Sequence, residues 1–227
     1  MEKIPVYFMP GLAASSTIFE HIHLPSDIFD VHNLEWIMPT ETESLEHYAA
    51  RIAELVLLPN PVLIGVSFGG IIVQEMARHL QAEKVIIISS IKTKYELPAI
   101  MKFAKATASY KLLPIATFLK VENTLRKYPL GNHINGRLEL YEKYLSVRDP
   151  FYLKWSIDKI IHWNRTEADP NVVHINGDED EIFASKNIKD YIKVKGGTHI
   201  MIVNRYKWFN ENLPGIILQK KVEAVSE

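Results

Sequence analysis

One pentapeptide, Gly65-Val66-Ser67-Phe68-Gly69, constrains the fold of this chain more than any other stretch. It lies between a short aliphatic run at 62–64, typical of a buried strand, and residues 71–80, whose apolar residues have helical spacing. Glycine two residues before and after the serine permits a sharp strand-to-helix turn, because only a hydrogen there avoids a clash. The pattern predicts a nucleophile elbow with Ser67 at its apex, and the alternative is an ordinary glycine turn.

Short apolar runs alternate with helical patterns along most of the chain. We predict strands at 6–9, 30–36, 62–66, 85–89, 172–176 and 191–194, and helices at 44–57, 70–80, 150–163 and 200–212. Ser44 and the pair Asp149-Pro150 are helix-start signals. Because parallel neighbouring strands need crossover connections, this alternation predicts an α/β fold: an open, mostly parallel sheet of about six strands with helices on both faces.

The alternation is interrupted between Ser90 and Asp149. This stretch has no convincing strand, and its apolar residues, punctuated by Pro98, Pro114 and Pro129, predict short helices. We expect a helical lid insertion at 91–149 within a single domain that spans 1–227.

The first part of this insertion is basic. Between 92 and 127 it carries eight basic residues and two acidic ones, namely Lys92, Lys94, Lys102, Lys105, Lys111, Lys120, Arg126 and Lys127 against Glu96 and Glu122. Such a run is usually a solvated outer face. The alternative is a surface that faces an anionic partner, such as a phosphate-bearing substrate tail or a membrane surface.

Composition excludes several classes of protein. The net charge of −1 gives no overall field that would attract nucleic acid, and the absence of cysteine excludes disulfides and a thiol nucleophile.

Pro5 and Pro10 break the first apolar stretch, so we expect no signal peptide. No run approaches the ~18 apolar residues of a membrane span, and we expect a cytoplasmic protein. His21 and His23 lack further nearby ligands, so we expect no metal and no cofactor.

A serine hydroxyl is a weak nucleophile, so Ser67 needs a base and an acid that orients the base. His199 follows Gly196-Gly197-Thr198 directly after the last predicted strand, at the sheet edge where catalytic groups of open α/β sheets gather. His174, in contrast, lies within a predicted strand and is expected to be a hydrogen-bonded core residue. The carboxylates of residues 178–180 follow the turn dipeptide Asn176-Gly177, and any of the three can supply the acid.

Four landmarks, in this order, resemble the α/β-hydrolase fold family across nearly the whole chain. They are Met9-Pro10-Gly11-Leu12, the elbow at 65–69, Gly177-Asp178-Glu179-Asp180, and Gly196-Gly197-Thr198-His199. The resemblance implies that Asp180, three residues after the glycine, is the acid. It also implies that the backbone N–H groups of Leu12 and Phe68 form an oxyanion hole. The chain departs from the family pattern at Pro10, where histidine is usual, and starts at the family's third strand, which implies an all-parallel sheet.

The same resemblance implies a serine hydrolase that cleaves an ester-type acyl bond of a small molecule through an acyl-enzyme, as a carboxylesterase does. A thioesterase or lactonase that acts on a substrate with an anionic tail is the alternative, because fold and triad do not select the acyl group. A ligand-binding receptor without turnover is an alternative of a different class. Leu12, Phe68, Trp155 and Phe183 are candidates to line a hydrophobic acyl pocket.

Overall fold

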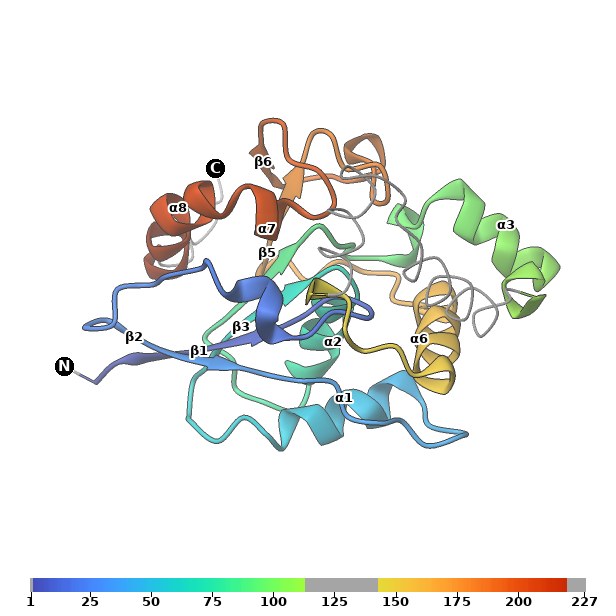
Figure 1. Cartoon of the computed structure of the whole chain (residues 1–227), viewed down its shortest axis with the longest axis horizontal. Helices are drawn as coiled ribbons and strands as arrows, with labels where there is room; N and C mark the ends of the chain where they lie inside the picture. The colour runs from blue at the N-terminus through green and yellow to red at the C-terminus, as the bar shows by residue number, and fades with distance from the viewer. Residues whose placement is uncertain (1, 113–142, 220–227) are drawn as a thin grey trace, which may run out of the picture.

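A six-stranded sheet forms the centre of the computed structural model, which describes residues 2–112 and 143–219 (Figure 1). In spatial order its strands are β2 (Phe29–Asn33), β1 (Ile4–Met9), β3 (Val62–Val66), β4 (Lys84–Ile88), β5 (Val172–Gly177) and β6 (Ile192–Val194). Every neighbouring pair is parallel, which confirms the predicted α/β sheet. The strand order reverses between β1 and β3, and ligands of such sheets bind where it reverses.

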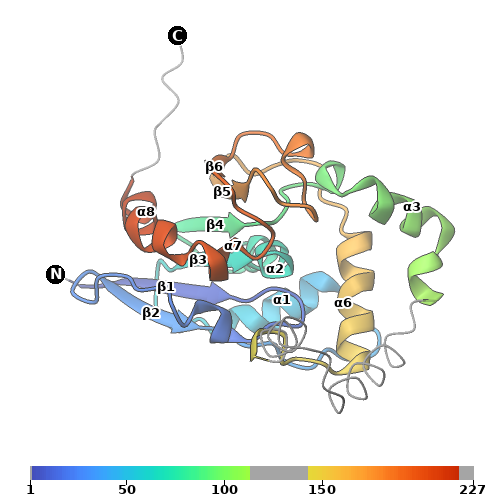
Figure 2. The ribbon, with the colours of Figure 1, turned by 45° about the horizontal axis from the view of Figure 1, so that its top comes forward.

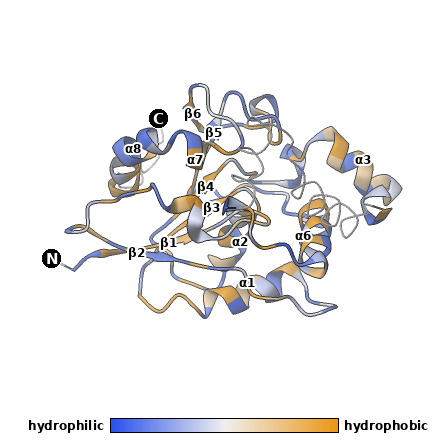
Figure 3. Cartoon of the chain, viewed as in Figure 1, coloured by the Kyte–Doolittle hydropathy of each residue, from blue (hydrophilic) through white to orange (hydrophobic). Residues whose placement is uncertain are grey.

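Helices cover both faces of the sheet, as predicted (Figures 1 and 2). One face packs against α1 (Leu45–Ala53), α2 (Phe68–Met76) and α6 (Pro150–His162), and the other against η1 (Ser16–Phe19), α7 (Met201–Asn204) and α8 (Tyr206–Leu218). Successive strand side chains point to opposite faces, so Leu63 joins the first core cluster and Ile64 joins the second. Apart from Lys84 at the start of β4, the central strands β3 and β4 carry no charged or polar side chain, because both of their faces are buried (Figure 3).

Two helix starts follow the predicted capping chemistry. The Ser44 hydroxyl accepts the N–H of His47 at 3.1 Å at the start of α1. At the start of α6 the Asp149 carboxylate accepts the N–H groups of Phe151 and Tyr152 at 2.9 and 3.0 Å, ahead of a proline at the first helical position.

Several element boundaries differ from the sequence prediction, and α1 and α2 end earlier than predicted, at Ala53 and Met76. β2 ends at Asn33 instead of residue 36, and beyond it the indole of Trp36 donates to the Gly11 carbonyl in the loop after β1. The helix predicted at 200–212 is two helices that meet at Arg205, whose guanidinium donates to the carbonyl of Gly196 at 2.9 and 3.1 Å. The second of these helices, α8, continues through Pro214 to Leu218.

The described part of the insertion is helical, as predicted. It contains η2 (Lys94–Glu96), α3 (Ala99–Thr107) and η3 (Ser109–Leu112), and no strand lies at 91–112 or 143–149. α3 packs beside α6, and the Tyr110 hydroxyl donates to the Asp158 carboxylate at 2.8 Å. The remaining residues named for the insertion (Pro114, Lys120, Glu122, Arg126, Lys127 and Pro129) lie outside the described residues.

Lys92 is not part of a basic outer face, so the prediction was wrong for this residue. Its side chain is buried, and its ammonium donates to the carbonyls of Lys189 at 2.9 Å and Asp190 at 3.2 Å. The Lys92 N–H donates to the carboxylate of Glu96, whose pKa is raised by burial. Lys92 therefore fixes the segment before β6, and a buried amine that makes these bonds does not face a ligand.

His174 lies buried in β5, where the sequence placed a core residue. The core position is thus as expected, but neither ring nitrogen has a hydrogen-bond partner of normal geometry among the described residues, and the backbone of Ser90 is the polar group that interacts with the ring. Burial lowers the pKa of His174 to about 3, and the charge of Lys92 acts in the same direction. The folded protein therefore holds this imidazole neutral.

We expect the free energy of unfolding to fall in mild acid because of His174. The pKa of His174 in the unfolded chain is about 6.5, so above that pH the imidazole is neutral in both states and the free energy of unfolding is at its full value. As the pH falls from there toward 3, only the unfolded chain takes up the proton, and the free energy of unfolding decreases. By linkage the loss is about 2 kcal/mol between pH 7.5 and pH 5.0. Urea denaturation at both pH values measures it, and His174→Gln should remove most of the difference. A pH dependence that survives the substitution would contradict this assignment.

Candidate active site

Ser67 sits at the apex of the turn between β3 and α2, with a backbone φ of 53°. This left-handed conformation is strained for a residue with a side chain. Hydrogen bonds hold it: the Ser67 N–H donates to the carbonyl of Ile88 at 2.9 Å, and its carbonyl accepts the N–H of Gly70 at 2.9 Å and the hydroxyl of Ser90 at 2.7 Å. The turn is thus anchored to β4 as well as to its own helix.

Glycine is required on both sides of Ser67. A Cβ on Gly65 would lie 2.2 Å from the carbonyl oxygen of Gly69, and a Cβ on Gly69 would lie 2.3 Å from that of Pro10. Both neighbours are backbone atoms that cannot rotate away. The elbow geometry predicted from the pentapeptide is therefore present, and its second glycine also brings the loop after β1 close to the turn.

The structure brings together the three side chains predicted to work as a unit. His199 Nε2 lies 3.0 Å from Ser67 Oγ, and His199 Nδ1 lies 3.0 Å from Asp180 Oδ2. Asp180 is buried, and its Oδ1 also accepts the N–H groups of Ile182 and Phe183 at 2.9 and 2.8 Å. A carboxylate held in this way places the imidazole proton on Nδ1 and leaves Nε2 free to accept the serine proton.

Of the three carboxylates that the sequence left open, Asp180 is the one that contacts the imidazole. Asp178 is exposed, and its Oδ1 accepts the N–H of Gly196 at 2.7 Å, which ties the loop after β5 to the loop after β6. Glu179 is exposed and joins the same two loops through its backbone N–H, 3.0 Å from the carbonyl of Gly197. The neighbouring carboxylates support the loops, whereas Asp180 reaches the ring.

Two backbone N–H groups lie ready beside Ser67. Phe68 is the first residue of α2, and helix N-termini carry unpaired donors. A Cβ on Gly11 would lie 3.4 Å from the Cβ of Ser67, which places the Gly11–Leu12 peptide at the nucleophile. Within residues 2–112 and 143–219 neither the Leu12 nor the Phe68 N–H donates to a protein acceptor. Pro10 removes neither of these N–H groups, since both belong to later residues.

A cavity of about 500 Å³ opens beside Ser67. Aliphatic side chains dominate its lining, which comprises Gly11, Leu12, Ala14, Ile18, Val66, Ser67, Tyr144, Leu145, His199, Ile200, Ile202 and Val203. Leu12 lines it as predicted, but Phe68, Trp155 and Phe183 lie in the buried core and do not. The sequence analysis did not predict the part of the lining formed by Ile200, Ile202 and Val203. The apolar run at 200–203 could have indicated it, because this run follows directly after the candidate base His199.

The described ranges contain no cluster of three or more His, Cys, Asp or Glu side chains arranged to hold a metal ion. Within those ranges no helix has the length and apolar character needed to cross a membrane. His21 and His23 instead flank Asn210, whose side chain bonds to the carbonyl of His21 and to the N–H of His23.

No family model and no curated protein matches the sequence. Solved structures do match the fold. An esterase from Thermogutta terrifontis has a TM-score of 0.64 at 15% identity, over 94% of this chain and 89% of its own. An esterase from Exiguobacterium antarcticum has a TM-score of 0.65 at 14% identity, over 96% and 93%. A proposed non-heme bromoperoxidase from Mycobacterium tuberculosis has a TM-score of 0.65 at 14% identity, over 93% and 91%.

These similarities, together with the all-parallel sheet, show that the chain has the α/β-hydrolase fold. The resemblance stated from the four sequence landmarks is thereby confirmed at the level of the fold. At these identities the comparison does not extend to the reaction.

Proposed function

We propose that the protein is a serine hydrolase that cleaves carboxylic esters through an acyl-enzyme. The observation that carries this proposal is the unbroken chain of contacts from buried Asp180 through His199 to Ser67 Oγ, each 3.0 Å long, at the carboxyl edge of the sheet. A ligand-binding receptor has no physical need for a base and an orienting acid beside its serine. The esterases of similar fold agree with this proposal.

The reaction follows from these positions. Ser67 Oγ attacks the ester carbonyl carbon while His199 Nε2 takes its proton, and Asp180 stabilises the imidazolium that forms. The N–H groups of Leu12 and Phe68 donate to the oxyanion of the tetrahedral intermediate. His199 then passes the proton to the departing alcohol oxygen, which leaves the acyl group on Ser67. Water attacks the acyl-enzyme by the same steps, releases the carboxylic acid and restores the Ser67 hydroxyl.

The cavity favours a neutral apolar acyl group over a substrate with an anionic tail. Among the residues that the structure describes, no lysine or arginine lines the cavity, and the lysines at 94, 102, 105 and 111 lie outside it. Aliphatic walls contributed by Ile18, Leu145 and Ile202 suit a hydrocarbon chain. We therefore place the carboxylesterase ahead of a thioesterase or lactonase of anionic substrates.

A panel of p-nitrophenyl esters from acetyl to decanoyl, with the matching acyl-coenzyme A thioesters beside it, tests this assignment. We expect kcat/KM to rise by up to about fourfold for each added methylene until the cavity is filled, because each buried methylene contributes about 0.8 kcal/mol. The thioesters, with a highly anionic leaving group, should be poorer at equal acyl length. A preference for the thioester would favour the anionic-tail alternative, and tight binding without hydrolysis would favour a receptor.

A further inference from the structure

Trp36 contacts both parts of the chain that supply the proposed oxyanion donors, one through a backbone carbonyl and the other through a side-chain ring. Its indole Nε1 donates to the carbonyl of Gly11 at 3.1 Å. Its ring stacks on the ring of Phe68, with centroids 5.2 Å apart and planes 11° from parallel. The sequence pattern placed Trp36 only at the end of a strand, whereas the structure places it between the loop after β1 and the first residue of α2.

The bond to Gly11 bears on Leu12 because both atoms belong to one planar peptide group. In a trans peptide the carbonyl of residue 11 and the N–H of residue 12 point in opposite directions. The Gly11 carbonyl accepts from Trp36 Nε1 and also from the Ala14 N–H at 3.0 Å. Two donors on the carbonyl side fix the direction of the N–H on the other side, and they polarise that N–H toward an acceptor.

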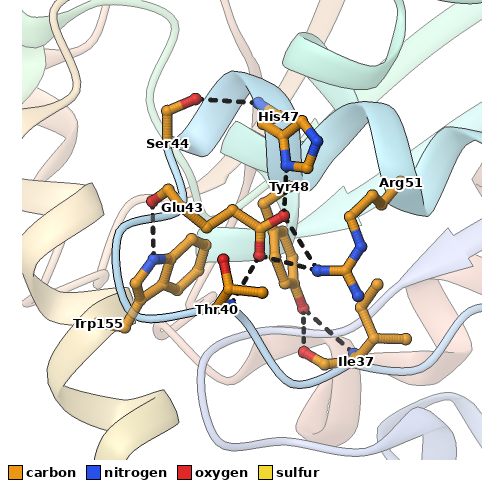
Figure 4. A network of polar contacts seen from close by, with 8 residues as sticks. All are labelled: Ile37, Thr40, Glu43, Ser44, His47, Tyr48, Arg51 and Trp155. Carbon is orange, nitrogen blue, oxygen red and sulfur yellow. Dashed lines mark hydrogen bonds and ion pairs between the residues drawn. The ribbon is translucent and has the colours of Figure 1, made fainter.

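The segment that carries Trp36 is itself held in place. Tyr48, fully buried on α1, donates its hydroxyl proton to the carbonyl of Ile37 at 2.7 Å and accepts the Ile37 N–H at 3.2 Å (Figure 4). The ring of Trp36 also packs against Tyr152 of α6, with centroids 5.4 Å apart. A residue bonded through both of its backbone polar groups has little freedom, so its neighbour Trp36 is fixed as well.

The buried carboxylate of Glu43 holds the later part of the same loop, just before α1. Glu43 Oε2 accepts the Thr40 N–H at 3.0 Å and an Arg51 N–H at 2.8 Å, and Glu43 Oε1 lies 2.7 Å from His47 Nδ1 (Figure 4). Burial would raise the pKa of Glu43, but the contacts from Arg51, Thr40 and His47 together lower it below its usual value. Its backbone carbonyl accepts the indole N–H of Trp155 at 3.0 Å. The loop is thus clamped to α1 and α6.

We infer that Trp36 is a positioning residue for the oxyanion hole. Its indole N–H orients the Gly11–Leu12 peptide so that the Leu12 N–H faces the developing oxyanion. Its ring packs on the side chain of Phe68, whose backbone N–H is the other donor. This role rests on the proposed function. Loss of a whole oxyanion donor slows catalysis by about 10² to 10³. A donor that remains but loses its alignment should cost about 10- to 100-fold in kcat.

The test is Trp36→Phe, which keeps an aromatic ring on Phe68 and removes the indole donor. The matched control is Trp163→Phe, because Trp163 is buried in the same core cluster and also donates its indole N–H, at 3.0 Å to Glu75, but does not contact the site. We expect kcat of Trp36→Phe on the best ester of the panel to fall about 10- to 100-fold with KM changed less than about threefold. Trp163→Phe should keep its kcat even where its melting temperature drops.

Inhibition by an alkylboronic acid gives a second readout, since the boronate adduct of Ser67 is tetrahedral and needs the oxyanion donors. Its Ki should rise with Trp36→Phe by about the factor lost in kcat and stay unchanged in Trp163→Phe. Active-site titration with a fluorophosphonate corrects both variants for unfolded protein. Wild-type kcat per titrated site in Trp36→Phe would overturn the positioning role while the proposed function stood. A wild-type protein inactive on every ester would overturn both.

Discussion

Ser67→Ala is expected to abolish both ester turnover and covalent labelling by a fluorophosphonate. A methyl group cannot attack a carbonyl or a phosphorus centre, and the remaining His199 and Asp180 have no nucleophile to activate. For a triad that acts as a unit, kcat should fall by about 10⁶, to the residual rate that the oxyanion donors and substrate binding support. Steady-state kinetics on the best ester and gel fluorescence after labelling measure the two effects on one preparation.

Ser89→Ala is the matched control for this experiment. Ser89 follows β4, the strand next to the elbow, and is fully buried with a positive φ of its own, 47°. Its hydroxyl has no hydrogen-bond partner in the described part of the chain, so its loss leaves no acceptor or donor unsatisfied. Labelling should persist in Ser89→Ala. Labelling that persists in Ser67→Ala would instead remove Ser67 from the site.

Short-range sterics explain why the elbow could be predicted from sequence. Gly65 is needed because the backbone of Gly69 occupies the space of a Cβ, and this requirement lies within five consecutive residues. Gly69 is needed because of the backbone of Pro10, a contact that only the fold creates. Helix starts such as Ser44 are local in the same sense. Strand pairing follows from the order of apolar runs, because a chain that alternates strands and helices has few ways to build a parallel sheet.

Contacts between distant loops explain what the sequence could not predict. The sequence pattern predicts Trp36 as the end of a strand, but the residue lies beyond β2, and its contact with Gly11 depends on the approach of the loop after β1. The cavity wall depends in the same way on α7 lying beside η1, which brings Ile202 and Ile18 together. Phe183 and Trp155 are aromatic, as many pocket residues are, but their rings pack in the buried core. Residue type alone does not show on which side of a loop or helix a ring will lie.

Asp180→Asn is expected to reduce kcat by roughly 10⁴-fold while the fold persists. The reason lies in the neighbours of the carboxylate. Its Oδ1 accepts the N–H groups of Ile182 and Phe183, so the amide oxygen of asparagine must keep that side. The amide NH₂ then faces His199 Nδ1, where it donates. The imidazole must carry its proton on Nε2, and in that tautomer it cannot accept the proton of Ser67.

Asp178→Asn separates this effect from a general loss of charge or loop structure. Asp178 precedes Asp180 by two residues and holds the loop after β6 through one bond, from the Gly196 N–H to Oδ1, which an amide oxygen can still accept. We expect its kcat to stay within about threefold of the wild type. Both variants lose one negative charge from the same loop, so a shared electrostatic effect would slow them equally. Comparable kcat values in the two variants would contradict the role of Asp180, whereas a large gap between them would locate the acid by its contact with the imidazole.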